Sequence, residues 1–228
     1  MKAIIIAAGR APRLLPLTKD NPQCLLKIKD KTILEKQVES LNKSGIRDIV
    51  VVVGYYADKI EGLCKKLRIK TVLNPFYNVS GMAMTLWTAK EELKEGFIFL
   101  YSDILFEEKV VKELVKNKGD VCLVIKRDGL REEAEKVVEK NGFIEKITKA
   151  EAEGENGEFI GLAKFSKNGA ERLIQELNKI AKVNINAPFI EIMENIIKSG
   201  EKVSAYDIKD SKFIDIDFPE DLEKAKNF

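Results

Sequence analysis

The sequence contains no histidine, and this absence removes several kinds of chemistry at once. Without imidazole there can be no His-based zinc site, no Ser-His-Asp triad and no histidine general base. Any catalysis must therefore use carboxylates, lysines, arginines, backbone amides and bound ions. Glutamine is also scarce while Lys, Glu and Ile are abundant. This balance is reported for proteins of thermophiles, so the composition weakly indicates a thermophilic source.

Cysteine is limited to three residues, an odd number without the spacing of a metal site. Cys24, Cys64 and Cys122 are therefore expected to be reduced core residues in an intracellular protein. No apolar run approaches the roughly 18 residues of a membrane span, and the N-terminal run is shorter than a signal peptide needs. The 39 basic and 37 acidic residues nearly cancel, which disfavours nucleic acid as a partner. We predict a cytoplasmic protein with no membrane partner.

Short apolar runs alternate with segments of helical periodicity in the first half of the chain. The predicted strands are 2–7, 48–53, 71–73, 97–101 and 121–125, which are rich in β-branched or aromatic residues. The predicted helices are 32–45, 57–67, 82–93 and 108–117, with apolar residues at i, i+3, i+4 and i+7. This order predicts an α/β fold with a doubly wound, mostly parallel, Rossmann-like sheet covered on both faces.

After residue 126 the pattern changes to a small β-hairpin elaboration. Residues 135–147 predict two strands around an Asn141-Gly142 turn. The remaining predicted elements are a strand at 158–165, helices at 167–180 and 187–199, extended segments at 203–208 and 213–217, and a closing helix from Pro219. Because no Gly/Ser linker separates the halves, we expect a single domain over 1–228.

The segment AAGRAPRLLPLTKDNPQCLLKI, residues 7–28, is too long for a tight turn, and its three prolines exclude a continuous helix. It leaves the carboxyl end of the first strand, where ligands bind in parallel sheets. Its small residues would let an anion reach the backbone amides, and its arginines add charge-assisted donors. We predict a phosphate cradle formed by Ala7, Ala8, Gly9, Arg10, Ala11 and Arg13. An ordinary strand-to-helix connection with solvated charges is the alternative.

A dinucleotide site is disfavoured, because Gly9 is the only glycine of the G-x-G-x-x-G pattern and prolines block the helix that should follow. The segment instead resembles the signature loop of the sugar-phosphate nucleotidyltransferase superfamily, A-A-G-x-G-x-R-L-x-P-L-T followed by P-K-x-L-L. The similarity continues through 50–60, 74–89, 101–106, 157–166 and 213–225. The Cys24-Leu25-Leu26 ending looks most similar to the branch that contains phosphocholine and aminoethylphosphonate cytidylyltransferases.

The resemblance implies a nucleotide-binding half at 1–120 and an acceptor-binding half at 121–228. Two residues depart from the signature. Ala11 replaces its second glycine, which still allows close approach. Gln23 replaces the lysine that contacts the nucleotide phosphates in the family, so weak transition-state stabilisation is expected unless another cation substitutes. A nucleotide-binding homologue with little or no activity therefore stays open as an alternative.

Two aspartates stand at strand ends. Asp103 follows the strand at 97–101, Asp217 closes the segment at 213–217, and strand alternation sends Asp215 to the same side as Asp217. Each could instead begin a turn or cap a helix. Mg²⁺ typically takes one or two protein carboxylates, and the resemblance implies that Asp103 and Asp217 are its ligands.

The resemblance implies transfer of NMP, with CTP as the favoured donor, to a small phosphorylated alcohol or a phosphonate. Such an acceptor is largely ionised at neutral pH and needs no side-chain base. Arg13, Asp103 and Asp217 are the expected catalytic residues. Beyond the cradle, the expected nucleotide contacts are Gln23, Ser80, Gly81 and Asp103, and the expected acceptor contacts are Lys149, Glu158, Gly161 and Asp215. A sugar 1-phosphate acceptor is the enzymatic alternative, and homo-oligomerisation is left open.

Overall fold

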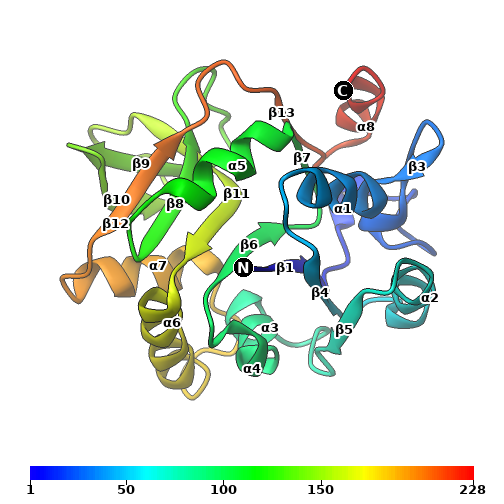
Figure 1. Cartoon of the computed structure of the whole chain (residues 1–228), viewed down its shortest axis with the longest axis horizontal. Coiled ribbons are helices and arrows are strands. Elements are labelled where there is room, and N and C mark those ends of the chain that lie inside the picture. The colour runs from blue at the N-terminus through cyan, green and yellow to red at the C-terminus, as the bar shows by residue number, and fades with distance from the viewer.

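A nine-stranded sheet forms the centre of the computed structural model, which describes all residues 1–228 (Figure 1). From edge to edge its strands are β5 (Lys70–Leu73), β4 (Asp48–Val53), β1 (Lys2–Ala7), β6 (Phe97–Tyr101), β11 (Gly157–Phe165), β8 (Val121–Lys126), β12 (Val203–Asp207), β10 (Phe143–Thr148) and β9 (Glu135–Lys140). The predicted α/β fold is confirmed.

The first four strands of that order are all parallel to one another. Ile4, Ile5 and Ile6 of β1 are buried on both faces of the sheet, as expected for a central parallel strand. The helices α1 (Ile33–Lys43), α2 (Ala57–Leu67) and α5 (Glu108–Lys116) contribute to the core on one face. The helices α3 (Met82–Thr88), α4 (Lys90–Leu93), α6 (Lys167–Ile180) and α7 (Phe189–Lys198) contribute to the core on the other.

The second half makes the sheet mixed rather than purely parallel. Strand β11 is antiparallel to both β6 and β8, and β9 pairs antiparallel with β10. No helix lies between β8 and β11 in the chain, and strands joined without a crossover helix pair antiparallel. The predicted hairpin is present, with φ of 52° at Asn141 and 84° at Gly142, the positive values that a tight hairpin turn requires.

The predicted helix at 82–93 is interrupted at Ala89. The Thr85 hydroxyl donates to the Gly81 carbonyl at 3.0 Å, and the Thr88 hydroxyl donates to the Thr85 carbonyl at 2.8 Å. Such bonds compete with the helical ladder, which accounts for the break.

The three cysteines are buried and free, as predicted. None of the helices has the length and apolarity that crossing a membrane would require.

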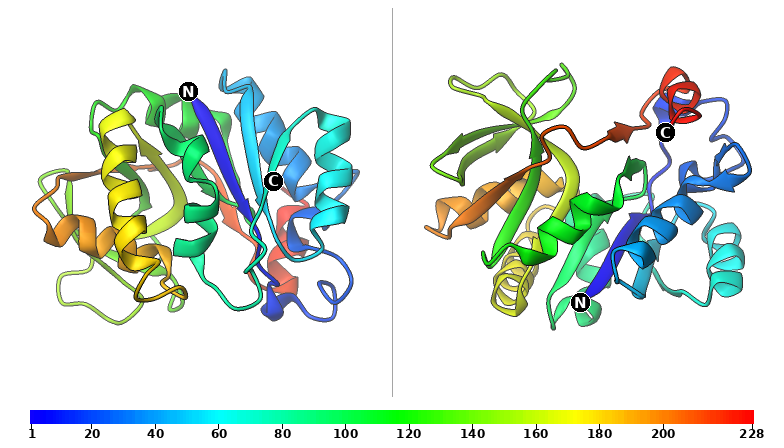
Figure 2. Two further views of the ribbon diagram at one scale, coloured as in Figure 1. Left: turned by 90° about the horizontal axis from the view of Figure 1, so that it is seen from below. Right: turned by 45° about the horizontal axis from the view of Figure 1, so that its top comes forward.

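The signature segment forms two 3₁₀ turns, η1 (Pro12–Leu14) and η2 (Gln23–Leu25), and then a short hairpin of β2 (Lys27–Ile28) and β3 (Lys31–Thr32). The closing helix α8 (Pro219–Ala225) packs beside β2, so the last helix of the chain meets the signature segment there (Figures 1 and 2). A separate two-stranded sheet pairs β7 (Ile104–Phe106) with β13 (Phe213–Asp215). This small sheet brings the two predicted metal-ligand segments together.

Candidate active site

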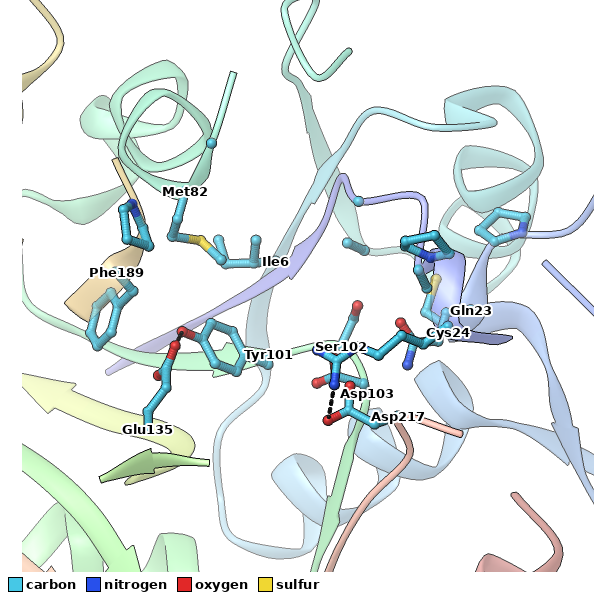
Figure 3. A pocket seen from close by; sticks show the side chains of 18 of the residues that line it. Ile6, Gln23, Cys24, Met82, Tyr101, Ser102, Asp103, Glu135, Phe189 and Asp217 are labelled. Carbon is cyan, nitrogen blue, oxygen red and sulfur yellow. Dashed lines mark hydrogen bonds and ion pairs between the residues drawn. The ribbon is translucent and has the colours of Figure 1, made fainter. Parts of the chain in front are cut away.

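A cavity of about 390 Å³ opens at the carboxyl ends of β1 and β6 (Figure 3). The signature segment forms one wall, the start of α3 and residues 186–189 form another, and the end of β6 forms its floor. The predicted residues that line it are Ala7, Gly9, Ala11, Arg13, Gln23, Gly81, Asp103, Lys149 and Asp217. The structure therefore gathers most of the predicted site from positions scattered over the chain.

Three carboxylates converge beside this cavity. Asp103 lies between β6 and β7, and Asp215 is the last residue of β13, opposite Ile104 in the antiparallel register. The Ile216 amide donates to the Asp103 carbonyl at 3.0 Å, which holds Asp217 next to Asp103. One oxygen from each of Asp103, Asp215 and Asp217 lies within 4.8 Å of the other two.

The electrostatics of this cluster favour a bound cation. Oδ1 of Asp103 and Oδ1 of Asp215 are buried without any hydrogen-bond partner. Burial, followed by the charges of Asp215 and Asp217, raises the pKa of Asp103 well above its usual range. Burial and Asp217 raise the pKa of Asp215 to about 6, partly offset by Arg131. Unpartnered buried carboxylate oxygens are costly, and they are the ligands that Mg²⁺ prefers, so the residues present fit this ion.

Two arginines contact the cluster from distant parts of the chain. Arg13 Nη1 lies 3.1 Å from Asp217 Oδ2, and Arg131 Nη2 lies 3.0 Å from Asp215 Oδ2. The Arg131 backbone amide also donates to Glu158, and its Nε lies 3.5 Å from the same carboxylate. Sequence reasoning missed Arg131, because no local motif marks the loop between β8 and β9.

The cradle is only partly as predicted. Ala11 adopts the left-handed conformation, with φ of 45° and ψ of 63°, where the family signature has glycine. Ala8 is buried and does not line the cavity; its carbonyl accepts from the Tyr55 amide at 3.1 Å. Arg10 is exposed outside the cavity, and its guanidinium lies 5.7 Å from the Tyr55 ring centroid. Ala8 and Arg10 therefore lie on the Tyr55 side of the loop and not on the cavity wall.

The wall opposite the cradle is formed by the start of α3 and the loop before α7. The Gly81 amide donates to the Ile185 carbonyl at 2.8 Å, and a Cβ at Gly81 would lie 2.4 Å from the Asn186 carbonyl oxygen. Ser80 lies outside the cavity, where its hydroxyl donates to the Phe76 carbonyl at 2.8 Å. Sequence reasoning missed the contribution of residues 186–189, because nothing local links them to α3.

A smaller cavity of about 100 Å³ adjoins the carboxylates beyond Tyr101. Lys149, Gly161 and Asp215, three of the predicted acceptor contacts, line it. Glu158 does not, because its side chain is only 1% exposed and is engaged by Arg131. Glu135 lines both cavities and was missed by sequence reasoning, since it lies on a hairpin strand whose pattern is typical of a solvated face.

A Rossmann-like sheet with a small-residue cradle, an arginine and an acidic cluster at its carboxyl edge is the arrangement expected of a nucleotidyltransferase. Residues 3–176 match the family described as the MobA-like NTP transferase domain, and the chain belongs to this family. It is 30% identical, over 98% of each chain, to the CTP:phosphoglutamine cytidylyltransferase of Campylobacter jejuni. It is 33% identical, over 51% of each chain, to the choline-phosphate cytidylyltransferase of Streptococcus pneumoniae.

These relatives place the chain in the cytidylyltransferase-like branch of the superfamily. A more distant relative is a UTP–glucose-1-phosphate uridylyltransferase of Haloferax volcanii, 27% identical over 99% of this chain and 95% of the relative. The fold also matches a solved inositol-1-phosphate CTP transferase from T. maritima with a TM-score of 0.85 and 20% identity, covering 99% of this chain and 94% of that one. The protein is therefore an enzyme of the nucleotidyltransferase class.

Proposed function

We propose that this enzyme transfers CMP from CTP to a small phosphorylated alcohol or a phosphonate and releases pyrophosphate, with Mg²⁺ as its cofactor. The observation that carries the proposal is the convergence of Asp103, Asp215 and Asp217 within 4.8 Å, next to Arg13 and the cradle. The two relatives that act with CTP on phosphorylated compounds support the choice of donor and acceptor class.

In this proposal Asp103 and Asp217 hold Mg²⁺, which supplies Lewis-acid stabilisation of charge on the phosphates when bound. Ala7, Gly9 and Ala11 let the triphosphate approach the backbone, and the guanidinium of Arg13 offsets charge that grows in the transition state. An oxygen of the acceptor phosphate or phosphonate attacks the α-phosphorus in line, and the bond to pyrophosphate breaks. The acceptor is already ionised near neutral pH, so the absence of histidine carries no penalty.

The base of the nucleotide is proposed to lie against Gly81 and Met82, where the start of α3 meets the loop before α7. The acceptor is proposed to occupy the smaller cavity, with Lys149 and Arg131 near its phosphate and the Tyr101 ring packed against Gly161 at its wall. Asp215 lies between the two sites because it contacts Arg131 while sharing the acidic cluster.

A sugar 1-phosphate acceptor is the second candidate, supported by the uridylyltransferase relative that aligns over nearly the whole chain. Pyrophosphate release should be measured with each of CTP, UTP, dTTP and GTP against phosphocholine, phosphoethanolamine, 2-aminoethylphosphonate and glucose 1-phosphate. We expect the highest kcat/KM with CTP and a non-sugar acceptor. Turnover with glucose 1-phosphate alone would favour the second candidate. Mg-CTP binding without turnover on any acceptor would favour an inactive homologue.

A further inference from the structure

Helix α1 carries a buried glutamine at a position where its apolar periodicity predicts an aliphatic residue. The other buried residues of this helix are Ile33, Leu34, Val38 and Leu41, and Gln37 lies in the same stripe with 1% of its surface exposed. A buried amide is costly unless its polar groups form hydrogen bonds. The hydrogen bonds of Gln37 are therefore a guide to its role.

The side chain of Gln37 holds the turn that carries Asp103. Its Nε2 donates to the Tyr101 carbonyl and to the Ile104 carbonyl, both at 2.8 Å. These two carbonyls flank Ser102 and Asp103, which form the turn between β6 and β7. One amide group thus joins the last residue of a central strand to the first residue of β7, and the proposed metal ligand lies between them.

Strand β7 needs such a partner because it pairs with β13 alone. The Asp103 carbonyl accepts from the Ile216 amide on the β13 side at 3.0 Å. Because backbone groups alternate between the two sides of a strand, the carbonyl of the buried Ile104 faces the other side. Helix α1 packs against β7 (Figure 1). The Gln37 amide supplies the donor that a second neighbouring strand would otherwise supply.

The oxygen of the same amide has no partner. Three buried side-chain atoms of the chain lack a hydrogen-bond partner, and they are Oε1 of Gln37, Oδ1 of Asp103 and Oδ1 of Asp215. A methionine or leucine would fill a similar volume in this helix without an unpartnered oxygen. All the hydrogen bonds of Gln37 go to the two carbonyls around Asp103. The presence of glutamine here is therefore explained by the turn rather than by the packing of the helix.

We propose that Gln37 is a positioning residue that sets the geometry of the metal site through Asp103. By holding the carbonyls on both sides of the turn, it keeps the Asp103 carboxylate within 4.8 Å of those of Asp215 and Asp217, although like charges repel one another. The amide is neutral and donates only to the backbone, so it holds the turn without pairing with the carboxylates. This inference rests on the proposed function, in which Asp103 binds Mg²⁺.

The test uses Gln37→Met in the full-length protein, because methionine has a similar shape but no donor. In the metal-free protein, hydrogen exchange measured by mass spectrometry over 101–107 should be about tenfold faster or more than in the wild type. Calorimetric titration with Mg²⁺ alone should give a dissociation constant raised about 10- to 100-fold. Gln37→Leu removes the donors with a different side-chain shape and should behave alike, which separates the lost hydrogen bonds from altered packing.

Turnover should show the same dependence on Mg²⁺. With CTP and the acceptor that the wild type uses best, the Mg²⁺ concentration for half-maximal pyrophosphate release should rise by a similar factor in Gln37→Met. The kcat at saturating Mg²⁺ should change less than about threefold, because all the groups that contact the substrates remain.

Ser44→Ala is the matched control, because it removes a similar bond from α1 that does not reach the turn. The Ser44 hydroxyl lies at the end of the helix, 2.9 Å from the Glu108 carbonyl oxygen beyond β7. Both Ser44→Ala and Gln37→Met should lower the midpoint of urea unfolding. Only Gln37→Met should change the Mg²⁺ affinity and the exchange over 101–107.

Unchanged Mg²⁺ affinity or unchanged exchange over 101–107 in a folded Gln37→Met protein would overturn the inference, as would equal effects of Ser44→Ala. Failure of the proposed function gives a different result. A wild type that binds Mg²⁺ but releases no pyrophosphate with any acceptor refutes the transfer reaction, while calorimetry and exchange still decide the role of Gln37. Normal turnover in the wild type, with the same Mg²⁺ requirement in Gln37→Met, refutes the inference alone.

Discussion

At the scale of the residue, Gln23 stands where the family signature has a lysine, and its side chain is already engaged. Its Nε2 donates to the Ile216 carbonyl at 2.5 Å, while the Ile216 amide donates to the Asp103 carbonyl at 3.0 Å. Ile216 is fully buried and lies beyond the end of β13, so its backbone has no strand partner there. Gln23 therefore ties the cradle to the segment that carries Asp217.

This contact sharpens the expectation for substitutions of Gln23. Gln23→Lys should leave turnover equal or raise it, because an ammonium can donate to the same carbonyl and also adds a positive charge near the phosphates. Gln23→Ala should weaken Mg²⁺ activation several-fold, since an unsatisfied buried carbonyl costs about 1–3 kcal/mol. Pyrophosphate release as a function of Mg²⁺ concentration measures both. A large loss in Gln23→Lys would show that the geometry depends on glutamine itself.

Substitution of the acidic cluster should separate activity from stability. Asp103→Asn and Asp217→Asn should each lower kcat by about a hundredfold or more while the fold survives. For Asp103→Asn we also expect a metal-free protein at least as stable as the wild type, because a buried and repelled charge is removed. Turnover and urea unfolding measure the two effects, with exposed Asp210→Asn as the control. Unchanged turnover would refute the roles proposed for these aspartates.

At the scale of the element, β6 and β11 are linked at one point by Gly161 and Tyr101. Gly161 has φ of +77°, and a Cβ there would lie 2.5 Å from Cδ2 of the Tyr101 ring. The chain can therefore pass Tyr101 only without a side chain at this position. The same contact sets the position of Tyr101 between the larger and smaller cavities.

Gly161→Ala should therefore destabilise the protein by about 1–3 kcal/mol and lower kcat/KM for the acceptor, because it combines backbone strain with displacement of Tyr101. Gly62→Ala is the matched control, since Gly62 lies in the exposed middle of α2 and a Cβ added there would have nothing within 4 Å. That change should stabilise the fold by about 0.5–1 kcal/mol. Urea unfolding measures the free energy of unfolding of both variants. A Gly161→Ala variant as stable as the wild type would contradict the steric argument.

At the scale of the whole molecule, the acidic cluster couples pH, metal and folding. Burial raises the pKa of Asp215 to about 6 and also raises the pKa of Asp103 well above its usual range, so the folded state holds these protons more tightly than the unfolded chain. For the metal-free protein, this contribution to stability is present near pH 4 and is lost as the pH rises through about 6 and beyond.

Protons and Mg²⁺ compete for the same oxygens, so the rise in melting temperature on adding Mg²⁺ should be small at about pH 5 and much larger at about pH 8. Thermal unfolding at both pH values, with and without Mg²⁺, measures this difference. The Asp103→Asn variant should show little Mg²⁺ effect at either pH. An equal Mg²⁺ effect at both pH values in the wild type would contradict the assignment.

Much of the fold could be predicted because its signals are local. The β-branched run at β4 and the apolar periodicity of α2 agree with the structure residue by residue, and the Asn141-Gly142 turn does so as well. The break after α3 was missed, because it depends on threonine hydroxyls that hydrogen-bond to backbone carbonyls rather than to solvent. The antiparallel insertion of β11 was not specified either, since pairing partners distant in the chain leave little trace in a local pattern.

The sequence by itself determined the chemistry available to this protein: no imidazole, a small-residue loop with arginine, and aspartates at the ends of strands. Residue type and local periodicity are sufficient for such conclusions. Only the tertiary structure decided that Arg131 contacts Asp215, that Gln23 holds Ile216 and that Glu135 faces Tyr101 without an ion pair. Those contacts join residues far apart in the chain, and they depend on strand order and register, which the packing of the whole molecule selects.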